Sequence, residues 1–360
     1  MNGQSIPSLT EEAIGLLQDL VSISSLSKEE HGTAEAIETY MKKYVPKVHR
    51  LKNNVWARNK YFDESKPTIL LNSHHDTVPA NGGYSRDPLF ATMESGKLYG
   101  LGSNDAGGCL VSLLATFLFF YQKEDLPYNI IFAATAEEEI SGKDGLELLF
   151  PQLGKIDVAL VGEPTLMKLA IAEKGLMVID AVARASAGHA ARDEGENAIY
   201  KAIEDIERCK NFKFEKKSGL LGEVKMSVTV INAGLRHNMI PEECKFTIDI
   251  RINEHYTHQE VFDILSSQLQ SDLTARSMRI QSSSIPVEHL LVQAGVQLGK
   301  SVYGSPTTSD QALINCISLK MGPGDSARSH SADEFIFVSE IENGIIDYIN
   351  ILQAFFKHTS

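Results

Sequence analysis

Short apolar runs that alternate with helical segments constrain the fold of this chain most strongly. Three such runs, "TILLNS", "YNIIFAATA" and "DVALVG", are typical of buried strands, and segments with helical periodicity lie between them. Strands that alternate with helices imply crossover connections and a parallel sheet whose faces are covered by helices. The sequence therefore predicts an α/β domain built on a mixed, mostly parallel sheet.

Helical periodicity marks five segments of this domain, and the first is expected to begin behind Ser8 or Thr10 as its N-cap. The last of the five is a long amphipathic helix. The expected helices span residues 9–22, 32–45, 106–122, 143–150 and 338–356.

The sequence pattern changes after about residue 174. The runs "GLMVIDAVARAS" and "KFTIDIRIN" alternate strictly between apolar and polar residues, as strands of an antiparallel sheet with one solvated face do. Helices are expected near 194–209 and 257–270. The order strand, helix, two strands, helix, strand predicts a compact α+β insert at 174–283, within a catalytic domain formed by 1–173 and 284–360.

Composition narrows the class of protein. A length of 360 residues favours two domains, and 43% hydrophobic with 22% charged residues is ordinary for a globular protein with a real core. The net charge of −13, without a large Lys/Arg cluster, argues against a nucleic-acid partner.

Three further features predict a cytoplasmic protein that has no membrane partner. The longest apolar stretch, "CLVSLLATFLFF", is too short to span a bilayer, and the N-terminal stretch lacks the basic and apolar regions of a signal peptide. The 4 cysteines form no CxxC pair, so we interpret them as free thiols in a reducing compartment.

Acidic residues and histidines follow the predicted strands at their carboxyl ends. "TILLNS" leads into "HHD", "IIFAATA" leads into "EEE", and "VALVG" leads into "EP". A fourth motif, "LYGLGSNDAGG", places Asp105 just ahead of a predicted helix, where the helix dipole favours an anion. Because ligands of open parallel sheets bind beyond the carboxyl ends of the strands, we expect these four motifs to converge.

Such a convergence of carboxylates requires cations, because buried carboxylates repel one another. Imidazole and carboxylate donors without paired thiolates suit zinc or a similar divalent ion. Two ions that share a bridging carboxylate would balance three carboxylate ligands and leave positive charge to acidify a water. The residues by themselves therefore predict a dinuclear metal hydrolase.

Five motifs, taken in order, resemble those of a known enzyme family. "HHDTVP", "LYGLGSNDAGG", "TAEEEISG", "VGEPT" and "GPGDSARSHSADE" look like the successive motifs of the zinc-dependent aminoacylase, carboxypeptidase G and acetylornithine deacetylase family. The length and the last motif look most like the acetylornithine deacetylase and succinyl-diaminopimelate desuccinylase branch. The resemblance implies a catalytic α/β domain with an inserted ferredoxin-like lid or dimerisation domain.

The resemblance also implies a set of metal ligands. His74 and Glu163 would bind one zinc ion, and Asp105 would bridge to a second ion held by Glu139 and His330. Co²⁺ and Mn²⁺ are alternatives to Zn²⁺. One departure is that the chain reads "AGGC" after the bridging Asp, where the family often reads Met-Lys-Gly-Gly, but this difference removes no metal ligand.

Three further residues of the same motifs receive roles. The resemblance makes Glu138 the general base, which takes a proton from the attacking water and delivers one to the leaving amine. Asp76 would hydrogen-bond the far ring nitrogen of His74 and so fix its tautomer. Because side chains alternate in an extended chain, His75 is expected to point away from the metal site, as a pocket-wall or packing residue.

The insert supplies the remaining candidates. "SAGHAAR" resembles the lid motif whose histidine, here His189, helps to polarise the scissile carbonyl, often from the other subunit. "HNMIPEECKFTIDIR" resembles the stretch whose Asn and Arg, here Asn238 and Arg251, receive the substrate carboxylate. Two of these residues also have a non-functional interpretation. His189 could be a histidine in a loop, and Arg251 could be a solvated charge on an alternating strand.

A last motif, "SPTTSDQALI", has two interpretations. Thr308, Ser309 and Asp310 could line the substrate pocket, or Ser309 or Asp310 could cap the next helix, and we favour the cap.

The expected function is that of a dinuclear zinc amidohydrolase, a metallopeptidase-type hydrolase that acts as a deacetylase. It would remove the acyl group from N-acetylornithine or N-acetylcitrulline in arginine biosynthesis, and would form a homodimer through the lid domain. A succinyl-diaminopimelate desuccinylase or a metal-dependent dipeptidase would share every residue named. A non-catalytic metal-binding relative is a further alternative, against which the intact Glu138 and the complete ligand set argue.

Overall fold

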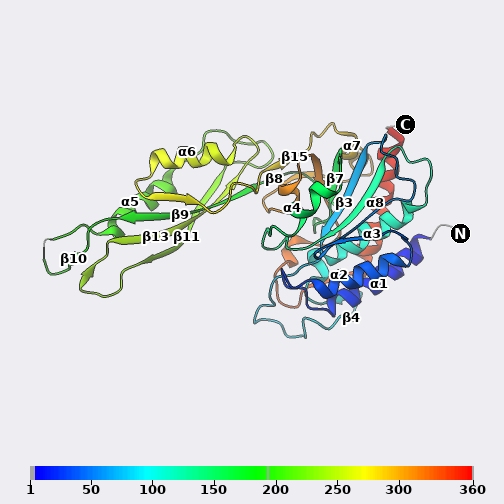
Figure 1. The fold of residues 1–360 in the computed structure, drawn as a ribbon, viewed down its shortest axis with the longest axis horizontal. Coiled ribbons are helices and arrows are strands. Elements are labelled where there is room, and N and C mark those ends of the chain that lie inside the picture. Colours follow the sequence, from blue (N-terminus) through cyan, green and yellow to red (C-terminus); the bar gives the residue numbers. More distant parts are fainter. Residues whose placement is uncertain (1–4, 193, 359–360) are drawn as a thin grey trace. The chain divides into compact units, whose positions relative to one another are not determined.

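The protein is described by a computed structural model over residues 5–192 and 194–358, and it forms two units (Figure 1). Unit 1 comprises the described residues of Met1–Ile171, Ser284–Tyr303 and Ser309–Ser360. Unit 2 comprises those of Ala172–Ser283 and Gly304–Thr308. The predicted bounds of the insert, 174–283, fall inside unit 2. The stretch 304–308 also groups with unit 2, where the backbone N–H of Lys174 donates to Ser305 O at 3.2 Å.

The main sheet of unit 1 is mixed, with parallel strands at its centre. Its strands follow the order β1-β2-β6-β3-β7-β17-β8-β15, and β16 pairs with β8. The parallel pairs are β3 with β6, β3 with β7, and β7 with β17. The strands of this path are β1 (His49–Leu51), β2 (Asn54–Arg58), β3 (Thr68–His74), β6 (Asn129–Thr135), β7 (Val158–Val161), β8 (Leu169–Glu173), β15 (Ser283–Ser284), β16 (Val302–Ser305) and β17 (Ile317–Lys320).

The central strands are buried on both faces, which explains why their sequences are continuously apolar. Ile69 and Leu71 belong to a large core cluster on one face of the sheet, and Leu70, between them, belongs to a second cluster. This alternation follows from the two-residue period of a strand. The predicted α/β fold with a mostly parallel, helix-covered sheet is confirmed.

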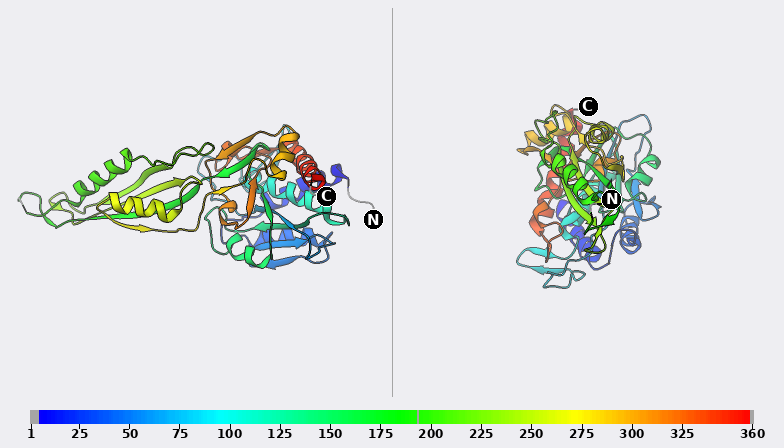
Figure 2. Two further views of the ribbon diagram at one scale, coloured as in Figure 1. Left: turned by 90° about the horizontal axis from the view of Figure 1, so that it is seen from above. Right: turned by 90° about the vertical axis from the view of Figure 1, so that its left-hand side faces the viewer.

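The helices of unit 1 cover both faces of the sheet unequally. Residues of α1, α2, α3, α7 and α8 contribute to the larger cluster, and α4 contributes to the smaller one (Figures 1 and 2). These helices are α1 (Ile6–Val21), α2 (His31–Lys42), α3 (Gly108–Tyr121), α4 (Leu146–Leu149), α7 (Leu290–Gln297) and α8 (Val338–His358). A small antiparallel sheet, with the order β18-β5-β4, is formed by β4 (Thr92–Glu94), β5 (Lys97–Tyr99) and β18 (Phe335–Phe337).

One helical stretch, Ser103–Tyr121, is long and apolar enough to cross a membrane by length and composition. It exceeds the apolar runs that are visible in the sequence because an irregular turn continues into α3. In the structure, 89% of its most apolar 18-residue segment is buried, as is typical of a helix in a protein core.

Unit 2 has the order of strands and helices that its sequence predicts, in the ferredoxin-like arrangement that the family resemblance implies. Its sheet is antiparallel with the order β11-β13-β9-β14, which is 2-3-1-4 in chain order, and α5 and α6 share its core. The elements are β9 (Gly175–Arg184), α5 (Ala198–Asn211), β11 (Lys225–Ala233), β13 (Glu243–Ile252), α6 (His258–Gln268) and β14 (Asp272–Ala275), with a two-stranded pair formed by β10 (Gly188–His189) and β12 (Met239–Ile240).

Three helix boundaries differ from the predictions for local reasons. The first helix begins behind Ser5, whose side chain accepts the N–H of Ser8, because Pro is tolerated in a first helical turn. The helix predicted at 143–150 is α4, which begins only at Leu146. A Cβ at Gly145 would lie 2.0 Å from Ala136 O, so the backbone there approaches the residue that follows β6 too closely for a side chain. In unit 2, α5 begins behind Asn197 rather than at 194, because the Asn197 side chain caps it.

Candidate active site

The carboxyl ends of three adjacent parallel strands place their polar motifs at one edge of the sheet. His74 ends β3, and its register partner on β6 is Thr135, two residues before Glu137. Strand β7, on the other side of β3, ends at Val161, two residues before Glu163. The sheet topology therefore brings together side chains that are far apart in the sequence, as the strand pattern indicated.

His74 is the centre of this cluster. Its Nε2 lies 3.3 Å from Asp105 Oδ1, 3.7 Å from Glu163 Oε1 and 3.9 Å from Glu138 Oε2. The ring is buried, and burial opposes its protonation. In the metal-free protein the hydrogen bonds with Asp105 and Asp76 and the nearby carboxylates nevertheless raise the pKa of His74 well above its usual value.

Asp105 lies between the two histidines. Its Oδ1 faces His74 and its Oδ2 lies 3.9 Å from His330 Nε2. It belongs to an irregular turn, Ser103–Gly107, where its own backbone is not helical (φ −119°, ψ 98°), and α3 begins only at Gly108. An Asp in this position presents one oxygen to each side, which is the geometry that a bridging ligand needs.

His330 and Glu139 form the second side of the site. His330 Nε2 lies 3.0 Å from Glu139 Oε2, and the ring is half-exposed. The hydrogen bond with Glu139 raises the pKa of His330 to about 9, against a smaller opposing effect of burial.

Asp76 does more than orient His74. His74 Nδ1 lies 3.1 Å from the Asp76 backbone oxygen and 3.4 Å from Asp76 Oδ1. The same carboxylate accepts the backbone N–H of Glu138 at 3.0 Å and that of Glu139 at 3.1 Å. It also accepts the hydroxyl of Ser27 at 2.7 Å. Asp76 therefore connects the end of β3 to the turn that carries Glu138.

Glu138 has the environment of a proton carrier. Burial is the main cause that raises the pKa of Glu138 well above its usual value, and the negative charges of Glu163, Asp310 and Glu139 add to it. A carboxyl with a raised pKa, placed next to candidate metal ligands, is suited to general acid–base chemistry.

The donor set fits two divalent cations. Ligand atoms of His74, Asp105 and Glu139 lie within 4.8 Å of one another, and so do those of His74, Glu138 and Glu163. Imidazole nitrogens and carboxylate oxygens at this spacing suit zinc and similar ions. The cluster holds four carboxylates near two imidazoles, so cations would remove the repulsion that the acids otherwise impose.

A buried carboxylate also holds the loop of Asp105. Glu334 Oε1 accepts the backbone N–H groups of Asn104 and Asp105, both at 2.9 Å, and its Oε2 accepts that of Gly102 at 3.2 Å. Burial, followed by the charge of Asp105, raises the pKa of Glu334 to about 7. The sequence reasoning missed this residue, because an acid in "SADEF" carries no local sign of burial.

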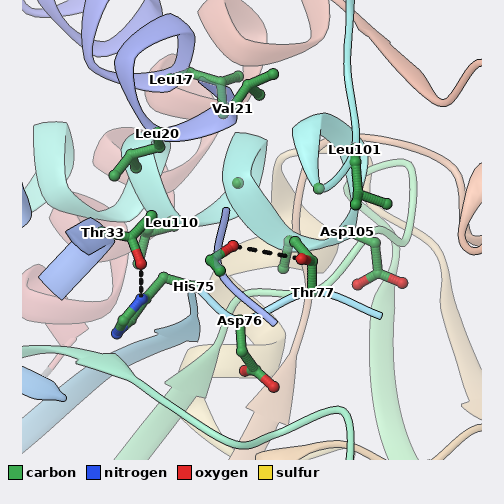
Figure 3. A pocket seen from close by; sticks show the side chains of 14 residues that line it. Leu17, Leu20, Val21, Thr33, His75, Asp76, Thr77, Leu101, Asp105 and Leu110 are labelled. Carbon is green, nitrogen blue, oxygen red and sulfur yellow. Dashed lines mark hydrogen bonds between the residues drawn. The ribbon is translucent and has the colours of Figure 1, made fainter. Parts of the chain in front are cut away.

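His75 lies on the other side of the strand end, as expected. Its Nδ1 is 2.9 Å from Thr33 Oγ1 and its Nε2 is 2.9 Å from Asn53 O. Figure 3 shows the ring directed toward Thr33 and away from Asp105. His75 and Thr33 line a cavity of about 20 Å³, which has room for about one water and which is also lined by apolar side chains of α1 and by Leu110 of α3.

The motif "TTSD" divides between two roles. Ser309 caps the short helical turn Asp310–Leu313, since its side chain accepts the Gln311 N–H at 3.3 Å, and this supports the cap interpretation. Asp310 is instead buried and accepts the Thr135 hydroxyl at 2.6 Å. Burial raises the pKa of Asp310 to about 6. Thr308 belongs to unit 2, where its hydroxyl lies 3.4 Å from Lys174 O.

The three predicted substrate residues all lie in unit 2. His189, on β10, is exposed and pairs with Met239 of β12, and the N–H of Ala190 donates to Asn238 O at 3.1 Å. His189 and Asn238 are therefore neighbours within unit 2. Their roles toward a substrate remain predictions.

Arg251 is already paired within its own strand. It lies on β13, and its Nε and Nη2 donate to the two oxygens of Asp249 at 2.9 and 3.1 Å. A substrate carboxylate would have to compete with Asp249 for this guanidinium. Its predicted role as a carboxylate receptor therefore also remains a prediction.

Metal affinity is expected to rise with pH. In the metal-free protein, a His330 pKa of about 9 means that the ring is protonated at neutral pH, and a cation must displace this proton to bind Nε2. The stabilising His330–Glu139 ion pair is fully present below the ordinary histidine pKa and is lost as pH rises through about 9. Zinc affinity should therefore increase by up to about tenfold per pH unit between pH 6 and 8.

Calorimetric titration of the metal-free protein in buffers with different ionisation heats measures both the affinity and the released protons. The His330→Asn variant is the matched control, because its side chain carries no titrating group. A zinc affinity that does not change over this pH range would contradict the assignment.

Comparison with known proteins gives a consistent result. The family model described as "Peptidase family M20/M25/M40" matches residues 70–354. A succinyl-diaminopimelate desuccinylase of Rickettsia bellii is 25% identical, over 93% of this chain and 95% of that protein. An acetylornithine deacetylase of Proteus mirabilis is 28% identical, over 76% of each chain.

A solved structure is similar over the whole chain. It is described as a dinuclear metal-binding peptidase of the M20 family from Bacillus subtilis, with a TM-score of 0.74 and 16% identity. The match covers 98% of this chain and 100% of that one. At this identity the likeness shows the fold alone.

Proposed function

Because the chain belongs to peptidase family M20/M25/M40, an enzyme family that acts on amide bonds, we propose that it is a dinuclear metal-dependent amidohydrolase that removes the acyl group from an N-acyl amino acid. The resemblance inferred from its motifs, and the expectation that the chain is an enzyme, are both confirmed. The substrate, the identity of the metal and the residue roles form the proposal.

One observation carries the proposal furthest. Asp105 presents its two oxygens to His74 and His330, and Glu138 lies 3.9 Å from His74 Nε2. Two ligand groups that share one carboxylate, with a further carboxyl beside them, match the needs of two-metal hydrolysis. A non-catalytic metal-binding relative would need the ligand carboxylates of the site, but it would not need the additional carboxyl of Glu138.

The cations, which we propose to be Zn²⁺, would supply Lewis acidity that polarises the amide carbonyl and lowers the pKa of water. His74 and Glu163 would hold one cation, and Glu139 and His330 the other. Asp105 would contact both. The contact of His74 Nδ1 with Asp76 keeps Nε2 facing the site, so that His74 presents a nitrogen lone pair there.

Glu138 would carry the proton in the reaction. Its carboxylate removes a proton from water as the oxygen attacks the amide carbon, and the resulting carboxylic acid donates that proton to the leaving amine nitrogen. Its buried environment favours the protonated form, which makes the removal of the proton from water more favourable. His189 would stabilise the developing oxyanion, and Asn238 and Arg251 would bind the substrate carboxylate.

N-Acetylornithine and N-acetylcitrulline are the proposed substrates, which would place the enzyme in arginine biosynthesis. Desuccinylation of succinyl-diaminopimelate is a second candidate, supported equally by the relatives that carry that name. The two reactions differ in the acyl group and in the amino-acid side chain, and the catalytic residues would be the same.

The zinc-loaded protein is expected to hydrolyse at least one N-acyl amino acid. A kcat/KM panel over N-acetylornithine, N-acetylcitrulline, N-succinylornithine and succinyl-diaminopimelate measures this, with chelated protein as the control. Preference for an acetylated substrate supports the first candidate, and preference for succinyl-diaminopimelate supports the second. Zinc-loaded protein that leaves all N-acyl amino acids intact would contradict the proposed function.

We further propose that the enzyme is a cytoplasmic homodimer that forms through unit 2. The edge strand β11 leaves Val230 and Ile231 about half exposed, and Leu235, which follows it, is 91% exposed. An edge strand with exposed apolar side chains is suited to pairing with a second copy.

A further inference from the structure

A buried carboxylate that none of the proposed roles uses lies beneath the turn that carries Glu138. Glu30, immediately before α2, has 0% exposure. Its Oε1 accepts the backbone N–H of Lys28 at 2.6 Å and that of Glu137 at 3.2 Å. Its Oε2 accepts the side-chain amide of Asn53 at 2.9 Å. This carboxylate therefore connects the start of α2 to the turn after β6.

The partners of Glu30 contact one another in turn. Asn53 accepts His75 Nε2 at its backbone oxygen, His75 Nδ1 contacts the Thr33 hydroxyl, and that hydroxyl lies 3.0 Å from Glu30 O. Figure 3 shows the Thr33–His75 contact. Because the Asn53 carbonyl oxygen can only accept, His75 donates to it from Nε2, and His75 Nδ1 and Glu30 O both lie within reach of the single Thr33 hydroxyl hydrogen.

Two carboxylates hold three successive backbone N–H groups of the turn. Glu30 accepts that of Glu137, and Asp76 accepts those of Glu138 and Glu139. Glu137 has a left-handed backbone (φ 57°), a conformation that a non-glycine residue adopts only when its surroundings impose it. The turn therefore depends on its acceptors for its shape.

We propose that Glu30 is a positioning residue for Glu138, and that Asn53, His75 and Thr33 hold Glu30 in place. This inference rests on the proposed role of Glu138 as the proton carrier. If the acceptor is lost, a buried N–H is left unpaired and the turn shifts. A displacement of about 1 Å at the catalytic group costs about 100-fold in rate. His75 thereby receives a role distinct from that of its neighbour His74.

A pair of substitutions separates positioning from simple stability. Glu30→Gln keeps one oxygen for the N–H of Glu137 but turns an amide NH₂ toward the NH₂ of Asn53, so two donors oppose each other. Asn53→Asp alone places two carboxylates together. The double variant Glu30→Gln/Asn53→Asp restores a donor facing an acceptor at this contact.

Each single variant is expected to lose about 10- to 100-fold in kcat, with KM within about twofold of the parent value, and the double variant should recover most of the loss. Glu35→Gln is the matched control, because Glu35 lies on the same helix with its side chain 69% exposed. The inference is overturned if the folded Glu30→Gln enzyme keeps the parental kcat, or if the double variant is no better than the single ones.

Hydrogen exchange of the peptide 136–142 provides a readout that does not depend on turnover. It should be faster in Glu30→Gln than in the parent protein, and it should return toward the parental rate in the double variant. Unchanged exchange in Glu30→Gln would overturn the inference even if no substrate were hydrolysed. A parent enzyme inactive on all N-acyl amino acids, in which exchange nevertheless follows this pattern, would contradict the proposed function and leave the positioning of the turn supported.

Discussion

Glu138→Gln is expected to lower kcat by about 10²- to 10⁴-fold while the protein keeps its metal ions and its fold. Glutamine has the size and shape of the glutamate, but it can neither remove a proton from water nor donate one to the leaving amine. The ionisation of Glu138 also disappears from the pH profile of kcat, because the amide does not titrate.

Steady-state kinetics on the best substrate of the panel, with metal content measured on the same samples, tests this expectation. Glu64→Gln is a suitable control for the substitution itself, since the Glu64 side chain is 84% exposed and precedes the start of β3. A Glu138→Gln enzyme that works at the full rate would remove Glu138 from the reaction.

His74→Ala is expected to reduce the metal content from two ions to at most one and to lower kcat/KM by about 10³-fold or more. His74 contacts Asp105 and Glu163, so its removal affects the first cation and the bridge to the second. The charge stabilisation by a catalytic cation is worth several kcal/mol, and about 1.4 kcal/mol corresponds to a tenfold change in rate.

Mass spectrometry of the purified protein measures the metal content, and thermal unfolding gives a second readout. Zinc at about 100 times its dissociation constant should stabilise the parent protein by about 2.7 kcal/mol, and this gain should shrink in His74→Ala. His75→Ala is the matched control, because His75 bonds to Thr33 and Asn53 and should leave both ions bound. Equal metal loss in the two variants would contradict the different roles of the two histidines.

The position of the candidate site could be predicted from the sequence because the carboxyl ends of parallel strands lie at the same edge of a sheet. The buried runs that lead into His74, Glu138 and Glu163 are separated by helices, which predicts parallel strands with their carboxyl ends at one edge. The structure shows that these three strands are also neighbours, in the order β6-β3-β7. His330 could be added only from the motif resemblance, since it follows a loop and no periodicity indicates where that loop lies.

The supporting residues could not be predicted, since their burial depends on contacts distant in sequence. Glu30 accepts the N–H of Glu137, 107 positions away, and Glu334 accepts that of Asp105, 229 positions away. Each looks like a surface acid in its local sequence. The burial of Asp310 could not be predicted for the same reason. Ser and Asp are both common helix caps, so the sequence "SDQ" does not show that Ser309 is the cap and Asp310 a buried acid.

The roles assigned to His189, Asn238 and Arg251 depend on the resemblance rather than on geometry. Each lies in unit 2, and Arg251 already has Asp249 as a partner. Substitutions at these positions therefore test the substrate-binding part of the proposal independently of the metal site.

Anomalous diffraction from crystals soaked in zinc tests the central claim most directly, because it locates the cations without reference to any substrate. We expect two peaks, one bound by His74 and Glu163 and the other by Glu139 and His330, with Asp105 between them in contact with both. A single peak, or zinc bound at other residues while these side chains remain free, would contradict the account of a dinuclear metal hydrolase.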